Sequence, residues 1–313
     1  MKRIIPIFLA VLIAAALFTA CGPVEKTDDG KLSVVATTFA PYDLVRQIAG
    51  GRANTSMLLP PASESHSFEP TPQDTIKIQN CDVFIYVGGD SDAWVDKLLD
   101  SMDTGNMTII TLMDCVDTVE EELLPGMEEE EGDEPEEPEY DEHVWTSPKN
   151  TKLIVQKISA ALQELDTADA DFYKQNETEY LAKLDELDAA FQAAVDGAAR
   201  KTLVFGDRFP FRYFADAYGL ECFAAFPGCS TETEPSAKTI QFLIDKINAE
   251  KIPVVFHIEL SNEKMANTIS EATGAKVLLL HSCHNVSRDD FLNGESYLSL
   301  MNRNVETLKE ALN

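Results

Sequence analysis

The chain has 313 residues, and 54 acidic side chains outnumber 25 basic ones, which leaves a formal charge of −29 at pH 7. Phosphate binding needs clustered Lys and Arg, so this composition argues against a nucleic-acid partner. Only one apolar run approaches the length of a membrane span, which excludes a multi-span membrane protein. The length predicts about two domains, each long enough to bury a core.

The amino terminus has the pattern of an export signal. A short basic start precedes the almost uniformly apolar residues 4–20, and Cys21 follows small residues. This order is typical of a signal peptide, and a Cys at this place resembles the bacterial lipobox, in which the thiol is lipidated. We expect 1–21 to be a lipoprotein signal peptide with lipidated Cys21, and 22–31 to be a tether. The folded part is then extracytoplasmic and lipid-anchored to the bacterial cell membrane; an uncleaved anchor helix is the alternative.

The remaining sequence predicts an α/β protein of two lobes. Short β-branched runs alternate with helical patterns on both sides of a central segment that has no convincing strand. Such alternation indicates mostly parallel sheets flanked by helices. We expect an N-terminal lobe at 32–150, a connecting helical segment at 151–200 and a C-terminal lobe at 201–313. A long helix joins the lobes in this prediction, and a ligand cleft lies between them.

One stretch of the N-terminal lobe carries much of the negative charge. Sixteen Asp and Glu lie between Asp114 and Glu142, and no Lys or Arg occurs from Leu98 to Pro148. Its low-complexity centre cannot bury apolar surface, so we expect an acidic disordered loop at 117–140. The loop is either a solubilising insertion or a loose collector of cations near a binding site.

The cysteines give less information. Without Cys21 an odd number remains, so at least one thiol of an exported protein is unpaired. Cys222 and Cys229 are close enough in sequence to pair across a loop, but the sequence does not establish a bridge.

Four of the five histidines lie beyond predicted strands. His66 and His143 follow strands of the first lobe, and His281 and His284 follow a strand of the second lobe. Parallel sheets place ligands beyond the carboxyl ends of their strands, and imidazole is the commonest neutral metal ligand. The pattern therefore predicts a metal site. The fifth, His257, lies inside a predicted strand and is expected to be a packed residue.

The segments around His66 and His143 resemble the ligand motifs of a known family. Residues 66–74 match a His-x-x-Glu-Pro-Thr-Pro pattern, and 37–42, 213–220 and 234–238 match further landmarks. From about residue 32 to its end, the chain resembles the cluster A-I substrate-binding lipoproteins of bacterial ABC importers, which carry zinc or manganese. The resemblance implies two lobes joined by a rigid helix, one metal ligand from each of four loops, and delivery of the ion to an ABC permease in the cytoplasmic membrane.

The second lobe departs from the family's pattern. Counting back from Tyr213 places Arg208 where the family has a His or Glu ligand, and a guanidinium group cannot bind a cation. Asp207 could ligate from the neighbouring position, or it could form an ion pair or a helix cap. The spacing of His281 and His284 lets both rings converge on one ion if the turn between them is helical. We expect this pair to replace the missing ligand.

The sequence therefore predicts a site of four imidazoles. Its members are His66, His143, His281 and His284. A nitrogen-rich set favours Zn²⁺ as the transported ion, with Mn²⁺ as the alternative. Four protein ligands leave no open position for water chemistry, so we expect a monomeric binding protein and no enzyme. A surface adhesin or a metal buffer on the same fold is the alternative function, and a zinc-dependent hydrolase is less favoured.

Overall fold

The computed structural model describes residues 29–65, 68–121, 123–127, 139–228 and 235–313. The predicted signal peptide with Cys21 and most of the predicted tether lie outside the described residues, and so does His66. Within the described ranges, no helix is both long enough and apolar enough to cross a membrane.

The first lobe is built on a four-stranded parallel sheet with the order β2-β1-β3-β4. Its strands are β1 (Leu32–Ala36), β2 (Ala53–Met57), β3 (Val83–Tyr86) and β4 (Thr108–Thr111). The helices of this part are α2 (Phe39–Ala49), α3 (Pro72–Gln79) and α4 (Ala93–Leu99). Helical crossovers cover both faces of a parallel sheet, which is why the interior strands β1 and β3 are so apolar.

The second lobe repeats this topology with the order β6-β5-β7-β8. Its strands are β5 (Thr202–Arg208), β6 (Glu221–Phe226), β7 (Val254–His257) and β8 (Lys276–Leu279). Its helices are α7 (Arg212–Tyr218), α8 (Ala237–Glu250), α9 (Lys264–Thr273), α10 (Arg288–Leu292) and α11 (Tyr297–Leu312). Gly206 lets α9 approach β5, because an added Cβ would lie 2.5 Å from Cα of Ala266. Cys222 is a buried free thiol, and Cys229 lies outside the described residues.

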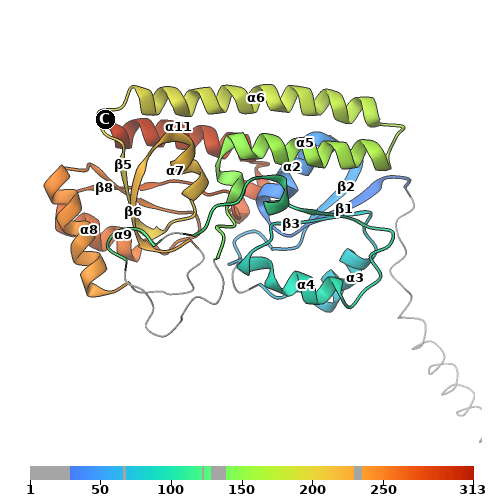
Figure 1. Ribbon diagram of the computed structural model, residues 1–313, viewed down its shortest axis with the longest axis horizontal. Helices are drawn as coiled ribbons and strands as arrows, with labels where there is room; N and C mark the ends of the chain where they lie inside the picture. The colour runs from blue at the N-terminus through green and yellow to red at the C-terminus, as the bar shows by residue number, and fades with distance from the viewer. Residues whose placement is uncertain (1–28, 66–67, 122, 128–138, 229–234) are drawn as a thin grey trace, which may run out of the picture. The chain divides into compact units, whose positions relative to one another are not determined.

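Two helices lie in the segment that the sequence assigns to the connection. They are α5 (Pro148–Leu165) and the 27-residue α6 (Ala170–Asp196). Helix α6 packs against α5 and α2 at one end and against α11 and α7 towards the other (Figure 1). It therefore contacts helices of both lobes. The predicted fold class, two α/β lobes with parallel sheets and flanking helices, is confirmed.

The acidic segment is ordered at both of its ends. Glu120 forms an antiparallel bridge with Tyr140, and the amide of Glu121 donates to the carbonyl of Glu139 at 2.8 Å. Leu124 is buried in the main hydrophobic core, so the disorder predicted for 117–140 does not extend over these parts. Composition did not indicate this order, because only a few apolar side chains anchor an otherwise acidic stretch. Its most acidic part lies outside the described residues.

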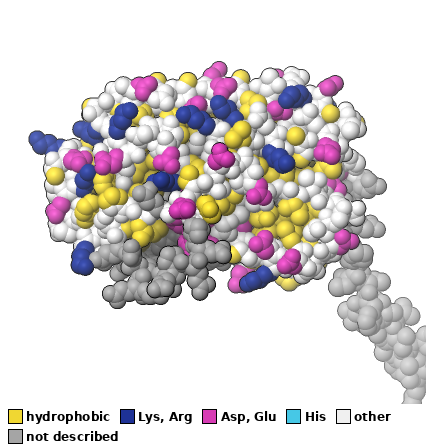
Figure 2. Space-filling model, in the orientation of Figure 1, with side chains coloured by type: hydrophobic (Ala, Val, Ile, Leu, Met, Phe, Trp, Pro, Cys, Tyr) yellow, Lys and Arg dark blue, Asp and Glu magenta, His cyan; other side chains and the backbone are white. Residues whose placement is uncertain are grey.

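The face drawn in Figure 2 mixes acidic and basic side chains, and no histidine of the described residues is visible on it. Burial explains this absence for three of them, because His143, His281 and His284 are each at most 8% exposed. These three histidines, which the sequence assigns to a metal site, therefore lie inside the molecule, where donor groups can be held in a fixed geometry.

Candidate metal centre

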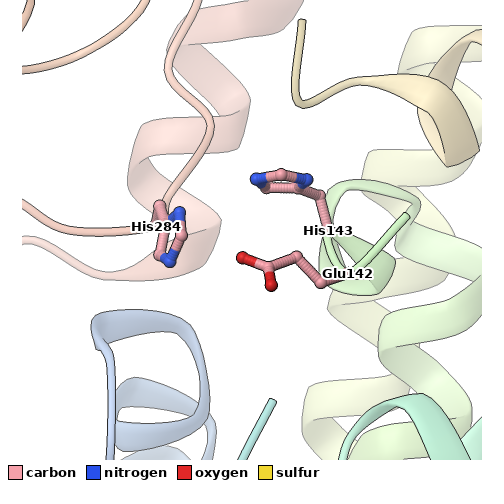
Figure 3. A group of neighbouring side chains, drawn as sticks. All are labelled: Glu142, His143 and His284. Carbon is pink, nitrogen blue, oxygen red and sulfur yellow. The ribbon is translucent and has the colours of Figure 1, made fainter. Parts of the chain in front are cut away.

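Two histidines and a carboxylate meet where the two lobes adjoin. The ring centroids of His143 and His284 lie 5.4 Å apart, and the rings are nearly perpendicular, at 83°. One potential ligand atom from each of these residues and from Glu142 lies within 4.8 Å of the other two. Figure 3 shows the Glu142 carboxylate and the His284 ring facing one another, with the His143 ring close to both. Tetrahedral zinc holds its donors roughly 3.3 Å apart, so a modest closure of these side chains fits an ion.

Asp141 orients the ring of His143. Its Oδ1 accepts the main-chain amide of His143 at 2.8 Å and lies 3.2 Å from ring Nδ1. When Nδ1 donates to this carboxylate, Nε2 keeps the lone pair that binds a metal. Burial lowers the pKa of His143, but the negative charges of Asp141, Glu142 and Glu121 outweigh burial and raise the pKa overall. The ring is thus fixed in direction and made more basic.

Glu142 is anchored by the turn that follows β3. Its Oε2 accepts the amide of Ser91 at 3.0 Å, and the hydroxyl of Ser91 donates to Oε1. Gly89 is required in this turn, because its φ is +73° and an added Cβ would lie 2.8 Å from Oε2 of Glu142. Burial, together with the nearby charge of Glu142, raises the pKa of Asp92 to about 7. The Glu142 carboxylate lies beside the two imidazoles, where negative charge favours a bound cation.

The loop of His284 is held through its main chain. Oε2 of Glu259 accepts the amide of Ser282 at 2.7 Å, and Oε1 accepts the Ser282 hydroxyl at 2.6 Å and the His284 amide at 3.0 Å. Between them, Cys283 is buried and has a left-handed backbone with φ of +62°, which is uncommon for a residue with a side chain. A single carboxylate after β7 thereby shapes the loop after β8.

Hydrogen bonds across the lobes bring the two sides of the site together. The indole of Trp145 donates to the carbonyl of Ser282 at 2.8 Å. The hydroxyl of Tyr213 donates to the carbonyl of Asp141 at 2.7 Å and accepts the amide of Val119 at 3.2 Å. Each bond joins a residue next to the site to the opposite lobe, so the positions of the two imidazoles depend on each other.

The segment that leads to His66 is tied to the loop after β8. The amide group of Asn285 donates to the carbonyls of Pro60 at 2.9 Å and Ser63 at 2.8 Å. His66 lies outside the described residues, but Ser65, directly before it, lines the same cavity as the two described imidazoles. The described chain therefore reaches the wall of the site at Ser65, one residue before His66 in the sequence.

His143 and His284 line a cavity of about 240 Å³ whose wall also contains Asp207 and Arg208. Asp207 is engaged with the main chain, since its Oδ1 accepts the amide of Arg208 at 2.9 Å and its Oδ2 accepts the amide of Ile258 at 3.2 Å. Arg208 reaches across to the first lobe, where its Nη1 lies 3.3 Å from a carboxylate oxygen of Glu64. The end of β5 thus contributes a cation to the cavity wall.

His281 lies outside the group that the structure brings together. Its Nδ1 accepts the amide of Cys283 at 3.0 Å and lies 3.6 Å from Glu259, and it does not line the cavity. Its Nε2 is buried and has no hydrogen-bond partner within the described ranges. Convergence of His281 and His284 on one ion requires a helical turn between them, and the left-handed backbone of Cys283 interrupts such a turn. Glu142 was not predicted from the sequence, although its position directly before a candidate ligand was a signal for it.

Comparison with known proteins gives the family of the chain. Residues 34–311 match the family described as "Zinc-uptake complex component A periplasmic". The chain belongs to this family. The zinc-binding lipoprotein AdcA of Streptococcus pneumoniae is 33% identical over 309 residues, which cover 96% of this chain and 60% of AdcA. The high-affinity zinc uptake system protein ZnuA of Bacillus subtilis is 29% identical over 307 residues, covering 96% of this chain and 94% of ZnuA.

A solved structure extends the likeness to the fold. The Zn(II)-bound ZnuA-like domain of Streptococcus pneumoniae AdcA has a TM-score of 0.73 and 31% identity, over 90% of this chain and 99% of that domain. The chain spans 60% of the length of the pneumococcal AdcA relatives. Members of the zinc-uptake component A family are solute-binding proteins that bind metal ions and work with ABC transporter permeases.

Proposed function

We propose that this member of the zinc-uptake component A family captures Zn²⁺ outside the cytoplasm and delivers it to an ABC permease. The meeting of His143 and His284 from opposite lobes, beside Glu142, carries the proposal. The zinc-binding relatives support zinc as the ion. In this proposal the protein is a monomeric carrier held by lipid on Cys21, with no catalytic activity and no nucleic-acid partner. Family membership does not favour an adhesin, a metal buffer or a hydrolase.

The proposed ligand set combines sequence and geometry. Its members are His66, His143, His284 and Glu142. Three imidazoles and one carboxylate suit tetrahedral zinc, and the carboxylate leaves manganese as the second candidate ion. Glu142 takes the place that the sequence prediction gave to His281, because its carboxylate faces the two described imidazoles.

The first experiment measures metal content. The full chain, purified from membranes in detergent without an affinity tag, is analysed by elemental mass spectrometry. We expect zinc in an equimolar amount, lost in His143→Ala and kept in His257→Ala. His257 is the matched control, because its Nδ1 lies 3.0 Å from the carbonyl oxygen of Ile258 and its side chain does not line the cavity. Equal zinc in both variants, or no metal after reconstitution, would contradict the proposal.

A second pair of variants separates Glu142 from His281. Calorimetric titration with Zn²⁺ is expected to show weaker binding for Glu142→Gln by about tenfold or more, and little change for His281→Gln. The reverse result would return His281 to the ligand set.

A further inference from the structure

Both oxygens of the Glu142 carboxylate are held by one residue. Oε2 accepts the main-chain amide of Ser91 at 3.0 Å, and Oε1 accepts the Ser91 hydroxyl. Glu142 is fully buried, and hydrogen bonds to a charged acceptor are roughly twice as strong as those between neutral groups. The carboxylate therefore has a fixed orientation beside the two imidazoles, and an ion that binds there meets it in that orientation.

Ser91 belongs to a turn that the first lobe holds from its interior. The neighbouring Asp92 is only 5% exposed, and its Oδ2 accepts the main-chain amides of Val87 at 2.6 Å and Gly88 at 3.3 Å. These bonds close the turn between β3 and α4 without using any candidate ligand. Ser91 thus presents its two donors to Glu142 from a support that does not depend on a bound metal.

Two donors from one residue restrict how a carboxylate can bind a metal. Donors that contact both oxygens lie opposite the carboxyl carbon, where an ion bound through both oxygens would also lie. With Ser91 in that place, an ion can still reach Glu142 through one oxygen, because each oxygen has a further lone pair. A carboxylate that binds through one oxygen suits the tetrahedral site of zinc, whereas manganese prefers an octahedral, oxygen-rich site. The hydrogen bonds from Ser91 therefore affect which ion fits.

We propose that Ser91 is a positioning residue that sets the ion selectivity of the metal centre. By holding both oxygens of Glu142, it limits this carboxylate to a single ligand oxygen and favours Zn²⁺ over Mn²⁺. The inference rests on the proposed function, since it requires Glu142 in the ligand set. Ser91 is uncharged, so the discrimination comes from the geometry of the carboxylate and not from the charge of the site.

The test compares the affinities for Zn²⁺ and Mn²⁺, each measured by titration of the full chain in detergent against a competing chelator. Ser91→Ala should lower the ratio of zinc affinity to manganese affinity by about tenfold, because zinc loses an oriented ligand while manganese gains access to a second oxygen. Ser91→Thr keeps the hydroxyl and should keep the ratio. Ser101→Ala is the matched control, since its hydroxyl donates to the carbonyl of Leu98 at the end of α4, and it should leave the ratio unchanged.

A double-mutant cycle separates this role from a merely structural one. If Ser91 acts through Glu142, then Ser91→Ala should leave the affinity ratio unchanged in a Glu142→Gln background, whereas a loosened turn would change it in both backgrounds. The inference fails if Ser91→Ala has the ratio of the unaltered chain, or if its effect is equally large without the Glu142 carboxylate. Failure of the unaltered chain to bind zinc would instead reject the proposed function, so the two failures are distinguishable.

Discussion

The two sides of the metal centre hold their imidazoles in different ways. On the first-lobe side, Asp141 contacts both the amide and the ring of His143, so the ring itself is oriented. On the second-lobe side, Glu259 binds the main chain around His284, so the loop is shaped. Asp141 therefore tunes the chemistry of a ligand, whereas Glu259 maintains the loop that presents a ligand. Substitutions of Asp141 should mainly lower metal affinity, and substitutions of Glu259 should mainly lower stability.

Removing either imidazole should have the largest effect. We expect His143→Ala and His284→Ala each to weaken zinc binding by more than about a hundredfold, because each deletes a donor rather than a supporting contact. Calorimetric titration with a competing chelator measures the loss. If only one of the two variants lost affinity, the two imidazoles would not contribute equally, and the other imidazole would lie outside the site.

Acid should release the metal by protonating His143. The pKa of His143 is raised, and a protonated ring cannot bind zinc, so affinity should fall at least about tenfold as pH drops from 7.5 to 5.5. In the metal-free protein the same raised pKa makes acid stabilising, whereas in the zinc-bound protein acid weakens metal binding. It adds stability below the ordinary pKa of histidine, and this stability is lost as pH rises through the raised value. An affinity independent of pH over this range would argue against imidazole ligands.

The two supporting carboxylates should separate affinity from stability. Asp141→Asn is expected to weaken zinc binding by about tenfold, with little change in the free energy of unfolding. Glu259→Gln should lower the free energy of unfolding by about 2 kcal/mol, because a nearly buried carboxylate loses charge-assisted bonds to the loop. Chemical denaturation and calorimetry on both variants test this. A stable Glu259→Gln protein with normal zinc affinity would remove the distinction between the two sides.

The contact between the lobes should give the smallest effect. Trp145→Phe removes the indole donor to the carbonyl of Ser282 and should lower the free energy of unfolding by about 1 kcal/mol. Trp94→Phe is the matched control, since the indole nitrogen of Trp94 has no hydrogen-bond partner within the described ranges. Denaturation midpoints compare the two variants. An equal loss in both would show that ring packing, and not the bond across the lobes, sets the cost.

Much of the fold could be predicted from the sequence. Alternating apolar runs and helical patterns indicated two parallel-sheet lobes, and the structure has two sheets of identical strand order. The helix at Arg288–Leu292 was not predicted, because five residues give too little periodicity to read. The ordered ends of the acidic segment were also missed. The pairing of the two ends and the burial of Leu124 depend on a few individual residues, which do not show in the average composition of the segment.

By itself, the sequence determined which residues stand at strand ends, since periodicity fixes where a strand stops and which side chain follows. Together with the resemblance to a known family, this singled out His66, His143, His281 and His284. Only the tertiary structure decided which of these side chains meet. Glu142 joins the group because a turn from another strand holds its carboxylate, and His281 stays outside because Cys283 adopts a left-handed backbone. Convergence in space depends on contacts between residues distant in the chain, and local sequence patterns do not encode them.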